Sequence, residues 1–139
     1  MPGANPELFP IGIVESPLRD RDSAPKQGDE GAPDAWLVMD PRMEKGLEGI
    51  GVGEEIIVLT WLDRAGRDTL AVHPRGDASR PAQGVFTTRS PDRPNPIGLH
   101  RVRVAEVDGG RLRVSNLEAL DGTPVIDLKP VLSGDVEER

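Results

Sequence analysis

The stretch Glu55-Ile56-Ile57-Val58-Leu59-Thr60-Trp61-Leu62 is apolar nearly throughout and is the strongest strand candidate in the sequence. A short apolar run bounded by turn signals is typical of a strand that is buried on both faces. Residues 63–67 are expected to form a turn, and residues 69–73 to return as the second strand of a hairpin. The sequence therefore predicts β-structure built around one central, buried strand.

Short apolar runs separated by turn residues continue on both sides of this stretch. Further strands are expected at residues 9–16, 35–39, 85–88, 97–107, 111–117 and 125–129, with a hairpin turn at 108–110. Asp40 and Pro41 are an N-cap signal for one short helix over residues 42–47. Seven to eight mainly antiparallel strands with one short helix indicate an all-β barrel or sandwich. We favour a small closed or nearly closed β-barrel, because closure removes exposed strand edges.

Length and composition set the broad class of the protein. The 139 residues suit a single domain over residues 1–139, with residues 1–8 and 134–139 expected to be flexible ends. The absence of cysteine excludes disulfides and thiolate metal sites. No apolar run approaches the roughly 18 residues that span a bilayer, and the N-terminus lacks the layout of a secretory signal. We expect no membrane association and a cytoplasmic location.

The formal net charge of −7 argues against a generic basic nucleic-acid-binding protein. Aromatic residues make up only 3% of the chain and tyrosine is absent, so few side chains are available to stack on bases. A local basic patch stays possible, because six arginines gather in the middle of the chain: Arg75, Arg80, Arg89, Arg93, Arg101 and Arg103. The alternative is that these charges belong to an ordinary solvated face.

Residues 84–98 hold three prolines, two arginines and an asparagine between two apolar runs. Proline fixes φ and also restricts the residue before it, so a loop of this composition is rigid. A rigid loop that displays Arg89, Arg93 and Asn95 suits a polar ligand, and we expect Arg93 and Asn95 to contact the substrate. The alternative is a stiff surface connection between two strands.

Other motifs argue against familiar kinds of site. Residues 49–53, Gly-Ile-Gly-Val-Gly, precede a strand instead of opening a helix, which excludes a dinucleotide-binding loop. His73 and His100 are too few for most histidine-based metal sites, so no metal is expected, and each is predicted to be a half-buried strand residue. Ser90 and Ser133 lack a nearby base, so the sequence gives nucleophilic catalysis no support.

Four separated segments are similar to the motifs of one known family. Residues 84–99 resemble the signature of the TsaA-like, or TrmO, family, and Pro10-Ile11-Gly12 with Ser16-Pro17 matches its opening. Residues 24–28, Ala-Pro-Lys-Gln-Gly, resemble the Pro-Arg-Gln loop of the family. Residues 120–130 match its closing motif, and several separated motifs in the right order argue against a chance match.

The resemblance implies a small β-barrel enzyme, an S-adenosylmethionine-dependent methyltransferase. It also implies a homodimer that binds this cofactor near the subunit interface. Members of the family methylate the N6 nitrogen of threonylcarbamoyladenosine beside the tRNA anticodon. By resemblance, the cofactor contacts are Pro25, Lys26, Gln27, Glu55, Ile56, Arg89, Leu99, Asp121, Gly122, Thr123 and Pro124. An arginine in this set suits a carboxylate, which a guanidinium can bind through two hydrogen bonds.

The sequence departs from the family pattern at three places. Residues 53–55, Gly-Glu-Glu, replace a Phe-Ser-His or similar triplet, Thr60 replaces a common aromatic residue, and His100 replaces a small hydroxyl residue. Glu54 and Glu55 are candidates for a catalytic base, or they are surface acids. Three functions stay open: methylation of tRNA, methylation of a small molecule, and non-catalytic binding of S-adenosylmethionine or a nucleotide. A basic surface beside the cofactor would favour tRNA.

Overall fold

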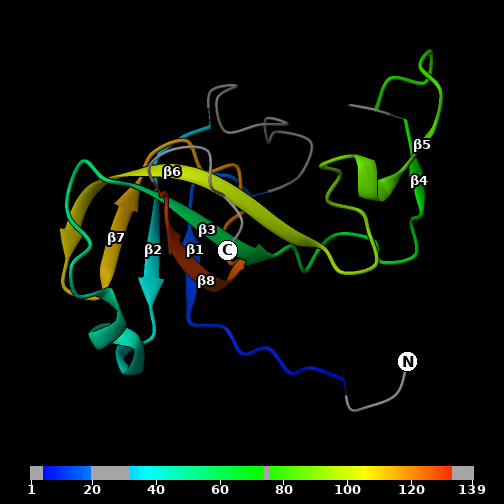
Figure 1. Cartoon of the computed structure of the whole chain (residues 1–139). Coiled ribbons are helices and arrows are strands. Elements are labelled where there is room, and N and C mark those ends of the chain that lie inside the picture. Colours follow the sequence, from blue (N-terminus) through cyan, green and yellow to red (C-terminus); the bar gives the residue numbers. More distant parts are fainter. Residues whose placement is uncertain (1–4, 20–31, 74–75, 133–139) are drawn as a thin grey trace.

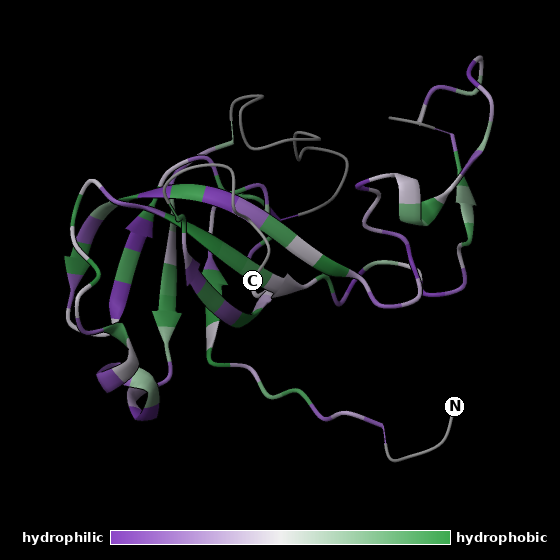
Figure 2. Ribbon diagram, viewed as in Figure 1, coloured by the Kyte–Doolittle hydropathy of each residue, from purple (hydrophilic) through white to green (hydrophobic). Residues whose placement is uncertain are grey.

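Strand β6 (Ile97–Asp108) is the longest strand, and it pairs with β3 (Glu55–Trp61) on one side and β7 (Arg111–Val114) on the other. Every second residue from Gly98 to Val104 is buried while the residues between them are largely exposed, as expected for a strand with one face in a core. Figure 2 shows bands of alternating hydropathy along the strands, and in β6 the exposed Leu99 and the buried His100 depart from that pattern. The pattern fixes which face of β6 lines the barrel.

The barrel closes through three further strands. They are β1 (Gly12–Glu15), β2 (Ala35–Met39) and β8 (Pro124–Pro130), and the closed order is β1-β2-β7-β6-β3-β8, with every neighbouring pair antiparallel (Figure 1). The computed structural model describes residues 5–19, 32–73 and 76–132. Within them the prediction of an all-β barrel is confirmed, with six strands in the ring and two outside it.

The core is made by inward side chains from all six barrel strands. Leu37, Val58, Leu112 and Val125 are fully buried in this cluster. Burying a large aliphatic side chain contributes about 1.5–3 kcal/mol, so a handful of such residues accounts for much of the driving force for folding. The strand β3 has no fully exposed residue, as the apolar run predicted.

The short helix predicted after Asp40 is present as a 3-10 helix, η2 (Pro41–Leu47). The Asp40 carboxylate accepts a hydrogen bond from the backbone N–H of Arg42 at 2.9 Å, and Pro41 occupies the first turn, where it loses no hydrogen bond. None of the helices in the described part of the chain is long and apolar enough to cross a membrane.

Residues 62–73 leave the barrel and residues 76–96 return to it, and together they form an arm (Figure 1). The arm holds β4 (Ala71–Val72), β5 (Gln83–Gly84) and the 3-10 turn η4 (Val85–Thr87), and β4 and β5 form a separate two-stranded sheet. The predicted hairpin of residues 55–73 is wrong, because β3 pairs with β6 and β8 while β4 pairs with β5. The strand predicted at 85–88 is also wrong, because Val85–Thr87 forms η4.

Candidate functional site

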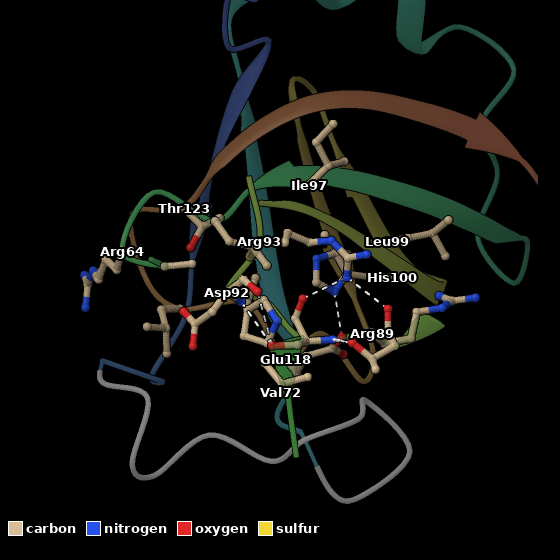
Figure 3. Close-up of a pocket in the computed structure, with 18 of the residues that line it drawn as sticks. Arg64, Val72, Arg89, Asp92, Arg93, Ile97, Leu99, His100, Glu118 and Thr123 are labelled. Atoms are coloured by element: carbon tan, nitrogen blue, oxygen red, sulfur yellow. Dashed lines mark hydrogen bonds and ion pairs between the residues drawn. The ribbon is translucent and has the colours of Figure 1, made fainter. Parts of the chain in front are cut away.

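A cavity of about 700 Å³ lies where the arm meets one end of the barrel (Figure 3). Its described lining comes from four segments: residues 62–65 after β3, residues 72–93 of the arm, the first four residues of β6, and residues 118–123 before β8. Its volume is within the range of small-molecule sites, about 300–1,000 Å³. The site is therefore assembled from segments that are far apart in the sequence.

Arg93 holds the loop of residues 85–93 in shape. Its guanidinium donates to the carbonyl oxygens of Val85 at 3.0 Å, Thr88 at 3.0 Å and Ser90 at 2.9 Å. The backbone N–H of Arg93 also donates to the carbonyl of Gly66 at 3.0 Å, which ties the loop to the turn after β3. Arg93 lines the cavity, as a substrate contact would, but three of its donors are already used inside the protein.

Asn95, the second residue predicted to contact substrate, does not line the cavity. Its side-chain oxygen accepts a hydrogen bond from Arg67 at 3.1 Å, and Arg67 lies over the Trp61 ring with 5.1 Å between the guanidinium carbon and the ring centre. This arrangement braces the base of the arm against the end of β3. A contact between Asn95 and substrate stays a prediction.

Arg89 is an exposed arginine on the cavity wall. Within the described part of the chain its side chain makes no hydrogen bond or ion pair, unlike those of Arg64 and Arg93, which bind backbone carbonyls. A guanidinium that has no internal partner and faces a cavity can bind a carboxylate or phosphate of a ligand. Leu99, expected from the same family motif, also lines the cavity and leaves 47% of its surface exposed.

The turn over residues 120–123 is built mainly from its own backbone. Thr123 N–H donates to the carbonyl of Leu120 at 3.1 Å, and Gly122 has φ of 84°, which is the geometry of a type II turn with glycine in its third position. The carboxylate of Asp121 accepts from the N–H of Ser16 at 2.9 Å. Of the four predicted residues 121–124, Thr123 lines the cavity, and it is 4% exposed.

Glu55 and Ile56 lie at the other end of β3 from the cavity. A strand advances about 3.3 Å per residue, so Glu55 is roughly 20 Å from the end of β3 at Trp61. Ile56 is 3% exposed and packs in the core. Neither residue, nor Glu54, is in the described lining. Pro25, Lys26 and Gln27 lie outside the described residues, so their predicted contacts with the cofactor stay predictions.

Glu55 takes part in an ion pair on the outside of the barrel. A hydrogen bond from Arg101 lowers the pKa of the Glu55 carboxyl, and the charge of Arg103 acts in the same direction. Arg103 also donates to the carbonyl of Gly53 at 2.6 Å. The two arginines of β6 that were candidates for a basic surface are thus paired with an acid.

Three polar side chains that were not predicted from the sequence form a hydrogen-bonded chain at the barrel wall. His100 Nε2 lies 2.8 Å from Thr60 Oγ1, and His100 Nδ1 lies 2.8 Å from Glu118 Oε1. His100 and Glu118 both line the cavity. His100 is 4% exposed rather than half-buried, while His73 is exposed and bonds to the carbonyl of Arg80 at 2.7 Å.

A signal for this chain of side chains was present in the sequence. Thr60 lies in the most apolar strand. His100 lies on the same inward face of β6 as Val102 and Val104, so Thr60 and His100 are both polar residues at core positions. Buried polar groups require partners. The sequence held no signal for the third side chain, because Glu118 lies in a loop and meets His100 only in the folded protein. Among the described residues, no group of three or more His, Cys, Asp or Glu side chains is placed to bind a metal.

Comparison with known proteins identifies the relatives of this chain. The family model for the tRNA-methyltransferase O N-terminal domain matches residues 13–134. An Archaeoglobus fulgidus protein named "S-adenosyl-L-methionine-binding protein" is 48% identical over 122 residues, which are 88% of this chain and 86% of that protein. A longer protein of the same organism, named "Probable S-adenosyl-L-methionine-binding protein", is 46% identical over 127 residues, which are 91% of this chain and 34% of its own length.

Solved structures give the same result. The crystal structure of TrmO from Pseudomonas aeruginosa superposes with a TM-score of 0.74 at 30% sequence identity. The superposition covers 98% of this chain and 61% of the Pseudomonas chain. The chain thus spans about three fifths of that structure and about a third of the longer archaeal relative.

Proposed function

The chain belongs to the family of the tRNA-methyltransferase O N-terminal domain, and on that premise we propose that it is an S-adenosylmethionine-dependent methyltransferase whose methyl donor binds in the cavity beside Arg89. The observation that carries the proposal is the position of Arg89. It belongs to the family motif, it lines the cavity, and within the described residues its guanidinium has no partner. The family relatives named for binding S-adenosylmethionine support the choice of ligand.

The residues of the cavity fit such a ligand. S-adenosylmethionine is a nucleoside that carries an amino acid, so it needs an anion-binding group, an acceptor for its cationic groups and apolar surface. Arg89 supplies the first and the carboxylate of Glu118 the second. Apolar surface comes from Leu62, Val72, Ile97, Leu99 and Leu120.

The bound cofactor would supply a methyl group on a positively charged sulfur, which is already activated for transfer. The task left to the protein is to hold the acceptor atom in line with that methyl group, and positioning alone can lower a barrier by several kcal/mol. The rigid loop of residues 85–93, fixed by Arg93, suits this task. Neither Glu54 nor Glu55 is in the described lining of the cavity, and a role for either as a base stays a prediction.

For the methyl acceptor we propose the N6 nitrogen of threonylcarbamoyladenosine in tRNA, which would place the reaction in the cytoplasm. The family model supports this choice, because it describes a tRNA methyltransferase. Beside the cavity, Arg80 and Arg89 have no hydrogen bond or ion pair from their side chains within the described residues, so both are available to phosphate. Arg75 lies outside the described residues.

A small-molecule acceptor is the second candidate, and one observation favours it. Arg93, Arg101 and Arg103, three of the arginines expected to face tRNA, bind backbone carbonyls or Glu55 instead. Because these three arginines are already paired, less positive charge is available to bind phosphate than the sequence predicted. A third candidate, a barrel that binds the cofactor without chemistry, is separated from both by an assay for methyl transfer.

We also propose that the working form is a homodimer. Large apolar side chains are exposed on the arm and on the first residues of strand β6. Each is at least 45% exposed: Leu70 and Phe86 on the arm, and Ile97 and Leu99 on β6. Apolar side chains gathered near a site are typical of a surface that a partner covers. The family resemblance, which implies a cofactor site near a subunit interface, supports this proposal.

Titration calorimetry with S-adenosylmethionine tests the proposal. The wild-type protein should bind, and Arg89→Ala should weaken binding by about 1–3 kcal/mol through loss of a charged hydrogen bond. Arg113→Ala is the matched control, because Arg113 pairs with Asp34 and Glu106 on the outside of the barrel. Binding that is unchanged in Arg89→Ala would remove Arg89 from the site, and no binding to the wild type would overturn the proposal.

The acceptor is tested by incubating the protein and labelled cofactor with tRNA that carries threonylcarbamoyladenosine but lacks its methyl group. Transfer of label to that nucleoside is the expected result, with tRNA lacking the threonylcarbamoyl group as the control. Binding of cofactor without transfer to this tRNA would favour a small-molecule acceptor or a non-catalytic barrel.

A further inference from the structure

Three polar side chains form a continuous chain of hydrogen bonds from the barrel core to the cavity. Thr60 is fully buried, the His100 side chain is 3% exposed, and the Glu118 side chain is 23% exposed. The two hydrogen bonds that join them are both 2.8 Å long. The chain starts where no ligand can reach and ends on a carboxylate that faces the cavity.

The hydrogen bonds assign the proton positions on His100. A carboxylate only accepts, so Nδ1 of His100 carries a hydrogen and donates it to Glu118. In the neutral ring Nε2 is then the acceptor, and the hydroxyl of Thr60 donates to it. Both nitrogens of the imidazole are therefore used within the protein, which suits a residue that positions its neighbour rather than one that takes a proton from substrate.

The result is a carboxylate held in one place. Oε1 of Glu118 is fixed by His100, and within the described residues no hydrogen bond or ion pair is made by Oε2. The residues that follow, Ala119 and Leu120, are 2% and 9% exposed, so the backbone that carries Glu118 is packed in place. A partly buried carboxylate is costly to keep unless it has partners, and here one oxygen is left for a ligand.

The charges that face Glu118 across the cavity define what it can bind. The guanidinium groups of Arg64 and Arg93 donate hydrogen bonds to backbone carbonyls. The carboxylate of Asp92 accepts a hydrogen bond from the N–H of Gly66. Asp63 and His73 are exposed on the rim. Arg89 is left as the cation for an anionic group, and Glu118 as the anchored anion for a cationic one. Figure 3 shows Arg89, His100 and Glu118 together on one side of the pocket, with Arg64 on the other.

We propose that Glu118, positioned by His100 and Thr60, binds a positively charged group of the cavity's ligand while Arg89 binds the carboxylate. The inference rests on the proposed function, since S-adenosylmethionine carries two such groups, the ammonium of its amino acid and the sulfonium. Either one would gain a charge-assisted interaction with the free oxygen of Glu118.

Calorimetric titration with three ligands tests the role of Glu118. S-adenosylmethionine carries both cationic groups, S-adenosylhomocysteine carries the ammonium alone, and 5′-methylthioadenosine carries neither. Glu118→Gln keeps the size of the side chain and should weaken binding of S-adenosylmethionine about tenfold or more, with 5′-methylthioadenosine unchanged. A similar loss for S-adenosylhomocysteine identifies the ammonium as the partner, and a loss for S-adenosylmethionine alone identifies the sulfonium.

Glu106→Gln is the matched control, because Glu106 pairs with Arg113 on the outside of the barrel and should change no affinity. Equal weakening of all three ligands in Glu118→Gln would overturn the inference, since the carboxylate would then act on the shared nucleoside or on the shape of the cavity. Unchanged affinity for all three would overturn it as well. If the wild type binds none of them, the proposed function itself fails, which is a distinct result.

Two substitutions of His100 test the positioning role. His100→Asn places an amide N–H near the position of Nδ1, so it should keep affinity for S-adenosylmethionine within about threefold of the wild type. His100→Leu removes the donor and should weaken binding as much as Glu118→Gln does. Equal losses in the two variants would show that His100 acts by filling space and would overturn the positioning role. If His100→Leu does not fold, the comparison of His100→Asn with Glu118→Gln carries the test.

Discussion

At the scale of the residue, Gly98 shows how closely the buried polar side chains are packed. A Cβ on Gly98 would meet Thr60 Oγ1 too closely and would lie 2.7 Å from His100 Nε2. Real Cβ atoms essentially never approach other atoms that closely, and neither neighbour is a flexible chain end. This chain therefore needs glycine at position 98 because of the Thr60 and His100 side chains that flank it.

Gly98→Ala should consequently destabilise the protein by about 1–3 kcal/mol, the usual cost of overpacking a core. The measurement is urea unfolding followed by circular dichroism. Gly46→Ala is the control, because nothing lies within 4 Å of a Cβ at this exposed position in η2. That control should be neutral or slightly stabilising. Equal stability of the two variants would mean that the strands separate to admit the methyl group.

At the scale of the element, the loop of residues 85–93 is shaped by Arg93 rather than by proline alone. The sequence predicted rigidity over residues 84–98 from three prolines, of which one, Pro91, lies in this loop. The structure adds a guanidinium that donates to three carbonyls of the loop. The side chain of Asp92 also accepts from the N–H of Gly66, which fastens the loop to the turn after β3. One wall of the cavity thus depends on a residue whose role looked like ligand binding.

Arg93→Ala should therefore loosen the loop before it affects the barrel. Amide hydrogen exchange of Thr88 and Arg93, whose N–H groups donate to Val85 and Gly66, should become at least tenfold faster, while amides of β3 keep their protection. Arg103→Ala, on the outside of the barrel, is the control. Unchanged exchange in Arg93→Ala would show that the prolines suffice and would return Arg93 to the group of ligand contacts.

At the scale of the whole molecule, exposed ion pairs make stability depend on acid. A hydrogen bond from Arg42 lowers the pKa of Asp40 from 3.8 to about 2, and Arg101 lowers the pKa of Glu55 from its ordinary value of 4.5. A lowered pKa in the folded state stabilises the protein at pH values above the unfolded pKa. That contribution is lost as the pH falls through the folded pKa.

The urea midpoint should thus be steady above about pH 5 and should fall as the pH is lowered from 4.5 toward 2. Glu55→Gln should show a smaller fall over this window, because one of the linked groups is gone. Glu48→Gln is the control, since Glu48 makes no ion pair in the part of the chain that the structure describes. The same fall in both variants would remove Glu55 from the acid response. Added salt should weaken the effect, since these pairs are exposed.

The strand pattern and the site differ in how far the sequence could predict them. The all-β class and the strand at residues 35–39 are confirmed. The strands predicted at residues 55–62 and 97–107 differ from the observed strands by at most one residue at one end. These predictions succeeded because the pattern of apolar residues that marks a strand is a local signal. The pairing of β3 with β6 and β8 was missed, because nothing local distinguishes a neighbour in sequence from a partner in space. The arm was mistaken for part of the sheet for the same reason.

The sequence by itself determined the barrel class, the family motifs and the presence of Arg89 in a rigid loop, since each depends on residue types at fixed spacing. Only the tertiary structure decided which polar side chains meet. Thr60, His100 and Glu118 come from two strands and a loop, and their hydrogen bonds follow from barrel closure and from the Thr60–Gly98 register of β3 and β6. A hydrogen bond needs an approach of about 3 Å, and only packing brings distant segments that close.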